Sequence, residues 1–493
     1  MLKRFVIAAV VIVLLSTAAT ASALLLEIKD DASLINQNPQ VQVSKGVLED
    51  VNEGGAKTIM VLGSDRRFTD GKAPSRSDTV MLVRLDPDKG ATSVMSLPRD
   101  LKVTIPNQGI DKLNAAYAYG GENLTIKTVK ALLAPHSPTG KFPISHVVNI
   151  NFGGFQRAVN HFNCMYIDVD KEYFNDNNPP AGGGGNYASI NVKAGYQRLC
   201  GQDSLDYVRY RHFDSDLVRA ARQQQFIKQA KAQVGVDKLV SDRKDLLKIF
   251  GRYTTTDIRG TRQILSLLKL TLNSSKKPLR EIQFPAASTG SFVTANENGL
   301  TRAVKRFMNA DLGTGKSNTP LESDEQSKKS SKKTKKKKQK ELDLASSGVV
   351  AAKTEGEDQA VALATKVAMP VLYPKVKTPA SQYMTDQSRS YILEDRQNHK
   401  YPSYRMVVKT RLVGQYYGIQ GTKWTDPPIL DGPHDTRKIG GRDFSIYKDG
   451  AGIQLIALKT KDGSYWVSNT LSQSLSNAQM LAIARTLGPI GGK

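Results

Sequence analysis

The 493 residues of this chain predict an α/β fold in the first half and a smaller, strand-rich α+β domain at the C-terminal end. Two observations predict this division. Strand-like apolar runs alternate with helical patterns over residues 56–312, which is typical of an α/β/α sandwich with a mixed central sheet. Ser, Thr and Lys then dominate the chain, which predicts a disordered linker over residues 313–362 and a separate domain over residues 363–493.

The N-terminal segment predicts a membrane anchor over residues 1–28, followed by a polar stalk over residues 29–55. Lys3 and Arg4 precede an apolar run that carries no charge before Glu27, and a run of this length can cross a bilayer as a helix. Positive charge ahead of the run favours a cytoplasmic N-terminus and an extracytoplasmic bulk. The segment "ATASA" (19–23) also fits a signal-peptidase site, but Leu24–Leu26 continue the apolar run and favour an uncleaved, single-pass anchor.

Charge and cysteine content fit a position outside the cytoplasmic membrane. The net charge of +24 predicts an anionic partner, which could be nucleic acid, a phospholipid surface or an anionic polymer. The predicted topology leaves too few cytoplasmic residues to bind DNA. Cys164 and Cys200 are the two cysteines, and an oxidising compartment favours a disulfide between them over two buried free thiols.

The order of strands and helices follows from the apolar periodicity. Residues 57–65 predict a buried strand, and residues 78–87 and 91–100 a strand pair joined by a turn. Residues 113–133 predict a helix broken at Gly120 and Gly121, residues 146–162 a strand followed by a helix, and residues 165–170 another strand. Asp216 to about Val234 predicts one long helix, and further helices are expected up to about Leu312.

The segment "YVRYRHFDSDLVRAARQQQ" (207–225) concentrates positive charge. Arg209 and Arg211 are two residues apart and share one face of an extended segment, whereas Arg219, Arg222 and Gln223 share one face of a helix. Guanidinium groups bind phosphate oxygens in a bidentate manner and stay charged at any working pH. The alternative is a solvated basic face, or ion pairs of these arginines with Asp214 and Asp216.

Carboxylates and further arginines occur at the predicted strand ends of the same domain. Asp65 ends one strand, Arg76 and Asp78 precede the next, and Arg99 and Asp100 end a third. Two carboxylates near several arginines suit a divalent cation that bridges a diphosphate, because Mg²⁺ prefers one or two carboxylates together with phosphate oxygens. The alternative is ordinary surface ion pairs. These residues predict a diphosphate-binding or phosphoryl-transfer site outside the membrane.

These motifs, in this order, resemble the LytR-CpsA-Psr family of cell-envelope proteins. The resemblance rests on "GSDRR", "RSDTVMLVRLDP", "SVMSLPRDLKV", "KLNAAYAYGG", "ISHVVNINFGGFQRAVN" and the basic segment, from about Lys57 to Gln225. It implies a membrane-anchored phosphotransferase with an α/β/α sandwich and an apolar pocket for a prenyl chain. Such an enzyme moves a glycopolymer phosphate from a polyprenyl diphosphate carrier to peptidoglycan and forms a phosphodiester.

The resemblance also implies roles for individual residues. Asp65 and Asp78 would bind Mg²⁺ or Mn²⁺ and, with Arg99, form the catalytic set; Asp65 is the first residue to test as the general base, which the motifs leave unassigned. The diphosphate would be held by Arg76, Arg99, Arg209, Arg211, Arg219 and Gln223. Arg67 and Arg222 match as neighbours of the site.

The C-terminal domain departs from the pattern of many relatives, and the resemblance assigns it no role. Alternating apolar residues with Asp-Gly turns at 449–450 and 462–463 predict a β-meander, and residues 476–488 predict a capped helix. "GTGKS" (313–317) lacks the first glycine of a nucleotide-binding loop, and "AGGGG" (181–185) is interpreted as a flexible loop. The lysine-rich linker is either an electrostatic contact with anionic polymer or headgroups, or a solvated spacer.

Three rival functions remain open at this stage. A transcriptional attenuator fits the charge but not the predicted topology. A non-catalytic module that binds the envelope would depend on the lysine linker rather than on Asp65 or Arg209. Hydrolysis of the same polyprenyl diphosphate glycan would use the same residues as transfer does, so the sequence does not separate a pyrophosphatase from a transferase.

Overall fold

The computed structural model divides the chain into two compact units, the first made of Met1–Ile167, Asn175–Val192 and Arg198–Gly313. The second unit comprises Asp168–Phe174, Lys193–Gln197 and Thr314–Lys493. The structure describes residues 41, 43–49, 55–64, 77–89, 92–178, 188–210, 214, 216–234, 238, 241–258, 263, 267, 270, 279–289, 292–309 and 345–491. The predicted anchor (1–28) and the segments 181–185 and 313–317 lie outside these residues.

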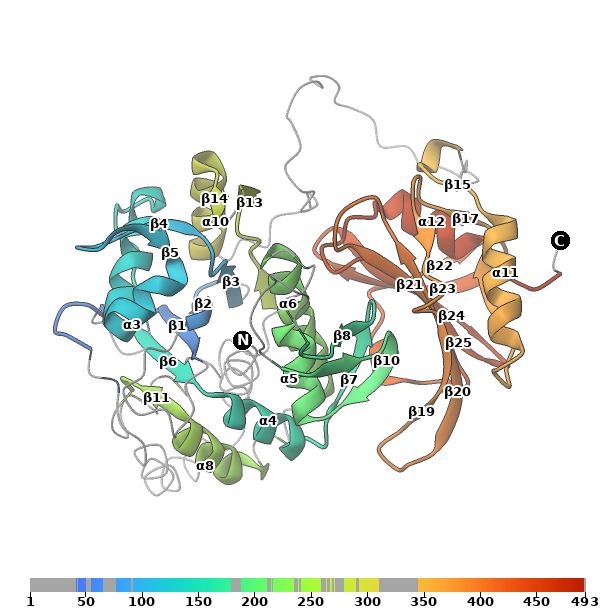
Figure 1. Cartoon of the computed structure of the whole chain (residues 1–493), viewed down its shortest axis with the longest axis horizontal. Coiled ribbons are helices and arrows are strands. Elements are labelled where there is room, and N and C mark those ends of the chain that lie inside the picture. Colours follow the sequence, from blue (N-terminus) through green and yellow to red (C-terminus); the bar gives the residue numbers. More distant parts are fainter. Residues whose placement is uncertain are drawn as a thin grey trace. The chain divides into compact units, whose positions relative to one another are not determined.

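A six-stranded mixed sheet in the order β11-β6-β1-β2-β3-β12 is the centre of the first unit (Figure 1). β1 pairs in parallel with β6 and antiparallel with β2, and β2 pairs antiparallel with β3. This arrangement confirms the predicted α/β class and mixed sheet. The strands are β1 (Lys57–Ser64), β2 (Ser77–Leu85), β3 (Thr92–Leu97), β6 (His146–Ile150), β11 (Thr254–Thr256) and β12 (Leu279–Glu281).

Both faces of this sheet are covered. Met60 and Leu62 of β1 belong to an apolar core that also contains residues of α3 (Leu113–Leu133) and α10 (Glu297–Asn309). Ile59 and Val61, which alternate with them and so point to the opposite face, are buried as well. The other helices of the unit are α4 (Phe152–His161), α5 (Gly201–Arg209), α6 (Asp216–Gln233) and α8 (Arg243–Tyr253), with the 3₁₀ turn η1 (Ala134–His136).

Four short strand pairs also occur in this part of the chain, and β7, β8 and β10 lie partly in the two segments that belong to the second unit. The pairs are formed by β4 (Lys102–Ile105) with β5 (Gly109–Lys112), β7 (Met165–Val169) with β10 (Gly195–Leu199), β8 (Tyr173–Asn175) with β9 (Ile190–Val192), and β13 (Ala286–Thr289) with β14 (Phe292–Ala295). Helices α8 and α10 follow Val234 as predicted, but strands β11 to β14, which were not predicted, lie there as well. Threonines and the aromatic and β-branched residues of β14 favour strands. Among the described residues, no helix is long and apolar enough to span a membrane.

α3 is broken where the sequence predicts. Gly120 and Gly121 have non-helical backbone angles, and Gly121 has a φ of 57° and a ψ of −148°, a conformation that residues with a Cβ rarely adopt. The first part of α3 begins at Leu113, whose amide donates to the carbonyl of Leu101. The break therefore redirects the chain between a short first segment and a longer second segment that ends at Leu133.

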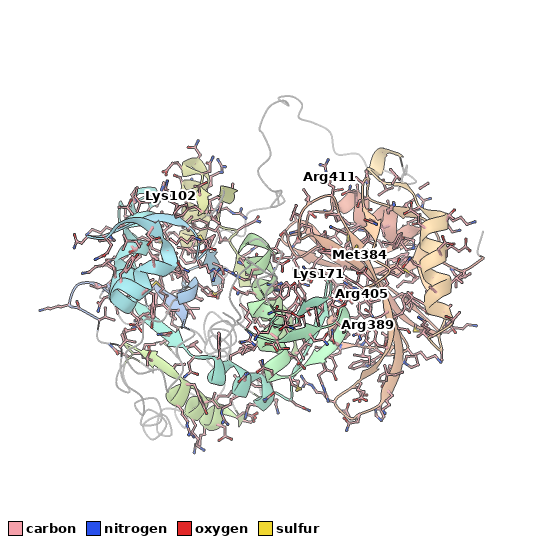
Figure 2. The ribbon with its side chains drawn as sticks, in the orientation of Figure 1. Lys102, Lys171, Met384, Arg389, Arg405 and Arg411 are labelled. Atoms are coloured by element: carbon pink, nitrogen blue, oxygen red, sulfur yellow. A yellow bond between two sulfur atoms is a disulfide. The ribbon has the colours of Figure 1, made fainter. Side chains whose placement is uncertain are left out.

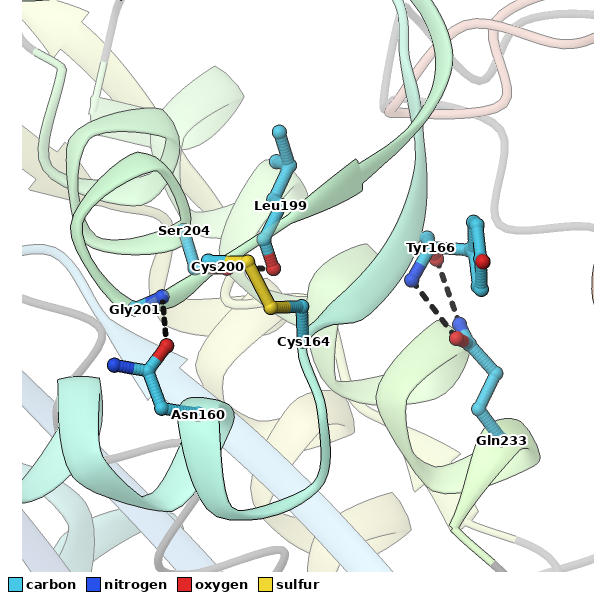
Figure 3. The surroundings of a disulfide bond; sticks show 8 residues. All are labelled: Asn160, Cys164, Tyr166, Leu199, Cys200, Gly201, Ser204 and Gln233. Carbon is cyan, nitrogen blue, oxygen red and sulfur yellow. Dashed lines mark hydrogen bonds between the residues drawn. A yellow bond between two sulfur atoms is a disulfide. The ribbon is translucent and has the colours of Figure 1, made fainter. Parts of the chain in front are cut away.

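The predicted disulfide between Cys164 and Cys200 is present, with a Cα–Cα distance of 4.3 Å (Figure 3). It joins the residue before β7 to the residue before α5. Nearby, the amide of Gly201 donates to Asn160 Oδ1 of α4 at 2.7 Å, and Ser204 Oγ donates to the carbonyl of Leu199 at 3.1 Å (Figure 3). These contacts fix the start of α5.

The second unit is built on a large antiparallel sheet in the order β18-β20-β21-β25-β24-β23-β22, with β19 paired to β20. The predicted meander is confirmed in β23, β24 and β25, and the predicted helix in α12, where Ser476 and Gln479 form a capping box. The elements are β15 (Val350–Ala351), β16 (Leu372–Pro374), β17 (Val376–Lys377), β18 (Gln382–Tyr383), β19 (Arg389–Glu394), β20 (Lys400–Lys409), β21 (Tyr416–Thr422), β22 (Asp435–Ile439), β23 (Arg442–Asp449), β24 (Gly452–Thr460), β25 (Gly463–Ser468), β26 (Leu487–Pro489), α11 (Lys353–Ala364), α12 (Asn477–Arg485), η2 (Ala345–Ser347) and η3 (Pro428–Leu430).

The folded part of the second unit begins before residue 363, where the sequence analysis placed the domain boundary. η2, β15 and α11 all lie within the range assigned to the linker. Ala360 and Leu363 of α11 pack into the apolar core of the unit. The polar residues of α11 gave it the composition of a linker, since only a few of its side chains are buried.

Two short segments from the first half of the sequence belong to the second unit, which the sequence did not predict. Asp168 accepts a hydrogen bond from Arg405 Nη1 of β20 at 2.8 Å, and the two side chains are only 2% and 1% exposed. The amide of Tyr196 donates to Gln420, and its ring packs edge-on against Trp466. Figure 2 labels Arg405 together with Lys171 and Arg389, which also take part in contacts of these segments within the unit.

Candidate functional site

One edge of the central sheet collects the strand ends that carry the predicted site residues. Ser64 at the end of β1 is paired with Ser77 at the start of β2, next to a bulge in the register. Leu97 at the end of β3 is paired with Val80 of β2, so Arg99 follows at the same edge. Ile150 at the end of β6 is paired with Gly63 and reaches this edge as well. Loops at such an edge of an α/β sheet commonly bind ligands.

The structure places the predicted acidic residues only in part. Asp78 lies in β2 beside the bulge, and its side chain is not described. Asp65, Arg67, Arg76 and Arg211 lie outside the described residues. Ser64, which precedes Asp65 in the chain, ends β1 at the same edge as Asp78.

Arg99 lies two residues after the end of β3 and next to the first turn of α3. Its side chain is 18% exposed, and its Nε atom is 3.4 Å from Asp100 Oδ2. The other carboxylate oxygen of Asp100 is 3.2 Å from Lys112 Nζ. The amide of Asn114 in α3 donates to the carbonyl of Arg99 at 3.0 Å, which fixes the backbone that carries the guanidinium group.

Arg209 is the last residue of α5, so the prediction of an extended segment at this position was wrong. Leu205 and Val208 are buried three residues apart, as on one side of a helix, and Asp206 accepts from both Gln202 and Arg209 along the helix surface. Arg209 Nε is 2.9 Å from Asp206 Oδ1, and its guanidinium carbon lies 5.8 Å from the centre of the Phe152 ring.

Phe152 connects Arg209 to the edge of the sheet. It begins α4 two residues after β6 ends at Ile150. The side chain of Arg209 is 16% exposed and therefore retains access to solvent. Desolvation, and then the neighbouring Asp206 carboxylate, raises the pKa of Asp203 in the first turn of α5. Arg99 follows β3, and Arg209 packs on Phe152 just after β6. The two arginines therefore lie at the same edge of the sheet, although β3 and β6 are not neighbouring strands.

Arg222 and Gln223 of α6 bind the protein backbone rather than facing solvent. Arg222 is fully buried; its Nη1 atom is 2.5 Å from Asp214 Oδ2, and its Nη2 atom donates to the carbonyl of Tyr210 at 2.7 Å. Gln223, which is 2% exposed, donates to the carbonyl of Val208 at 3.2 Å. For Arg222 the alternative of an ion pair with Asp214 is confirmed. These side chains hold the backbone at Val208 and Tyr210, on either side of Arg209.

Arg219 lies one helical turn before Arg222 and Gln223 and is 6% exposed. It shares their side of α6, as the spacing predicts. The side chain of Asp216, the other predicted ion-pair partner, is not described.

A polar group at the same edge was not predicted from the sequence. Asn149 of β6 donates from Nδ2 to Tyr117 Oη at 2.7 Å and to Glu122 Oε1 at 2.9 Å, and Tyr117 Oη is 3.2 Å from Glu122 Oε1. Tyr117 precedes the break in α3 and Glu122 follows it. The two glycines were the only sequence signal near this group, because Asn149 lies in an otherwise apolar strand and far along the chain.

The described residues contain no group of three or more His, Cys, Asp and Glu side chains placed to hold a metal ion. The predicted ligands Asp65 and Asp78 are carboxylates, the hard oxygen donors that Mg²⁺ and Mn²⁺ prefer. The residues that precede them in the chain, Ser64 and Ser77, are paired with each other at the edge of the sheet.

Comparison with known proteins identifies the family. The family model described as "LytR_cpsA_psr family" matches residues 13–311, which is more than half of the chain. The chain belongs to the LytR_cpsA_psr family. The match covers the predicted α/β domain up to residue 311 and stops before the predicted linker and the C-terminal domain, so the family assignment concerns the central sheet and its edge.

Two relatives of this family member are named as transferases. It is 34% identical over 174 residues to the polyisoprenyl-teichoic acid–peptidoglycan teichoic acid transferase TagT of Bacillus subtilis, covering 34% of this chain and 50% of that protein. It is 31% identical over 214 residues to the enzyme TagU, of the same description, from Oceanobacillus iheyensis, covering 42% of this chain and 60% of that protein. The chain therefore spans about half the length of these relatives. A solved structure described as TagT bound to LIIa-WTA matches with 25% identity and a TM-score of 0.42, over 55% of this chain and 98% of that one.

Proposed function

We propose that this LytR_cpsA_psr family member transfers a glycopolymer phosphate from a polyprenyl diphosphate carrier to peptidoglycan. The observation that carries the proposal is the convergence of Arg99, from the end of β3, and Arg209, packed on Phe152 after β6, at one edge of the sheet. Paired strand ends bring the backbone of Asp78, and the residue before Asp65, to the same edge. The names of the teichoic acid transferases support the same class of reaction.

The arginines would bind the diphosphate, because guanidinium groups bind phosphate oxygens in a bidentate manner and hold the negative charge that develops during phosphoryl transfer. Arg99, Arg209, Arg211 and Arg219 would contact phosphate oxygens, together with Arg76. Arg222 and Gln223 would act by holding the backbone at Tyr210 and Val208. Asp65 and Asp78 would hold Mg²⁺ or Mn²⁺, which when bound neutralises phosphate charge.

In the proposed reaction a sugar hydroxyl of peptidoglycan attacks the phosphorus atom that carries the glycopolymer. A new P–O bond forms, the bond to the bridging oxygen breaks, and polyprenyl monophosphate leaves. Such a reaction takes place where lipid carrier and wall meet, outside the cytoplasmic membrane. The apolar segment between Arg4 and Glu27 would anchor the chain there, with its N-terminus in the cytoplasm.

The proposal is tested with the full chain, purified in detergent from a bacterial membrane and extracted for lipid mass spectrometry. A co-purified polyprenyl phosphate or diphosphate is expected, and the Arg209→Ala, Arg211→Ala double variant should lose it. Arg302→Ala is the matched control, because Arg302 is exposed on α10 of the same unit. The purified chain should then join a polyprenyl diphosphate-linked glycan to peptidoglycan fragments. A folded chain that neither binds nor turns over this donor would refute the proposal.

A further inference from the structure

A hydrogen-bonded group at the sheet edge contains a carboxylate that has no role in the function proposed above. Both Asn149 Nδ2 and Tyr117 Oη donate to the same oxygen of Glu122, at 2.9 and 3.2 Å. Tyr117 and Asn149 are each 7% exposed, whereas Glu122 is only half-buried. Within the described part of the chain, Glu122 Oε2 accepts no hydrogen bond. The two donors therefore orient the carboxylate and leave one oxygen available.

The backbone places this carboxylate among the predicted phosphate-binding residues. Asn149 is paired with Leu62, three residues before Asp65, and lies three residues before Phe152, which packs against Arg209. Tyr117 lies one helical turn after Asn114, whose amide donates to the carbonyl of Arg99. Three residues span about 10 Å in a strand and about 4.5 Å in a helix.

The first segment of α3 therefore joins the two sides of the site. Its start is bonded to the backbone after β3, and Tyr117 near its end is bonded to β6. β1 and β2 lie between β3 and β6 in the sheet (Figure 1). Asp78 lies at the start of β2, and Asp65 follows the last residue of β1 in the sequence. The break at Gly120 and Gly121 turns the chain so that Glu122 reaches the side chains of Tyr117 and Asn149. Glu122 is thus held at the edge of the sheet from which the predicted phosphate-binding residues Arg99 and Arg209 are presented.

We propose that Glu122 is the general base that receives the proton of the acceptor sugar hydroxyl, an assignment that rests on the proposed transfer reaction. The hydroxyl oxygen forms the new bond to phosphorus, its proton passes to Glu122 Oε2, and the electron pair of the broken P–O bond leaves with polyprenyl monophosphate. A general base must lie within hydrogen-bond reach of the proton that it removes, and the oriented, half-buried oxygen of Glu122 meets this need. A carboxylate would repel the diphosphate itself, so a hydroxyl group is the better ligand.

The purely structural alternative is that Glu122 only holds α3 to β6. Glu122→Gln separates the two, because the amide oxygen of glutamine can still accept from Asn149 and Tyr117 while it can no longer take a proton at neutral pH. We expect Glu122→Gln to melt at the wild-type temperature and to retain co-purified lipid. Its rate of transfer should fall on the order of 100-fold or more, the usual effect of removing a general base.

Two further variants sharpen the test. Glu122→Ala should regain part of its activity when formate is added, since a small carboxylate can replace the missing base but cannot restore the contacts of α3. Tyr117→Phe keeps the carboxylate and should lower the rate only a few-fold. Glu297→Gln is the matched control, because the side chain of Glu297 is 83% exposed at the start of α10.

The outcomes distinguish this inference from the proposed function. Wild-type turnover together with a Glu122→Gln rate within three-fold of wild type would overturn the assignment of Glu122 and leave the transferase proposal intact. If the wild-type chain does not turn over the donor, either with a sugar acceptor or with water, both proposals are rejected. Hydrolysis without transfer would reject the transferase but keep Glu122 as the base, provided that Glu122→Gln slows hydrolysis to the same extent.

Discussion

The disulfide between Cys164 and Cys200 permits a quantitative prediction about the first unit. The two cysteines are 36 residues apart in sequence, and the bridge closes a loop that contains β7 to β10. In the chain-entropy model a loop of this size lowers the entropy of the unfolded chain enough to stabilise the fold by about 4 kcal/mol. Replacing both cysteines by alanine should therefore lower the free energy of unfolding of the first unit by this amount.

The expected loss corresponds to a fall in melting temperature of about 8–16 °C, at roughly 2–4 °C per kcal/mol for a unit of this size. Both tryptophans of the chain, Trp424 and Trp466, belong to the second unit. Unfolding of the first unit is therefore followed in urea by hydrogen exchange of peptides from β6 and α4. Wild type treated with a reductant is the control and should show a similar loss. A change below about 1 kcal/mol in both would refute the reasoning.

Three further predictions concern buried or hydrogen-bonded carboxylates. Asp168→Ala should destabilise the second unit by about 3–5 kcal/mol, seen in its tryptophan fluorescence, because Arg405 would stay buried without its partner; replacing both residues by apolar ones should recover much of the loss. Asp214→Ala should cost a similar 3–5 kcal/mol by leaving Arg222 buried and unpaired, with loss of hydrogen-exchange protection in residues 207–210. Desolvation would raise the pKa of Asp395, but hydrogen bonds from its own loop lower it to about 2. Because this pKa lies below the ordinary value of about 3.9, the contribution of the Asp395 carboxylate to stability is complete above about pH 3.9 and disappears as the pH falls through about 2. A carbon-13 NMR titration in which the Asp395 carboxyl signal does not move upfield near pH 2 as the pH is lowered would contradict this.

Strong local patterns predicted much of the fold. The apolar runs of β1, β2 and β3, the glycine break in α3 and the Asp-Gly turns of the second unit all follow from neighbouring residues. Arg209 was predicted in an extended segment because its two-residue spacing from Arg211 was taken as strand-like. The alternation of the arginines with Val208 and Tyr210 also fits a strand. Leu205 and Val208 are both buried and lie three residues apart, which is the spacing of one side of a helix.

Long-range contacts set the limit of prediction at the site. Asn149 is 32 residues from Tyr117 and 27 from Glu122, and no local spacing connects them. The same holds for Asp168, whose charge is compensated by an arginine 237 residues later. The roles of Asn149 and Asp168, polar residues within otherwise apolar strands, became clear only when the structure showed their partners.

The discontinuous second unit has a consequence for how the chain is made and shortened. Asp168 and Tyr196 are synthesised long before Arg405 and Trp466, the side chains that bury them. Until the last strands have left the ribosome, the carboxylate of Asp168 and the ring of Tyr196 lack the residues that bury them in the folded protein. A protein that ends at residue 313 would contain these two segments but never the strands that bury them. Loss of solubility in such a fragment would then indicate the missing strands of the second unit and not a defect of the central sheet.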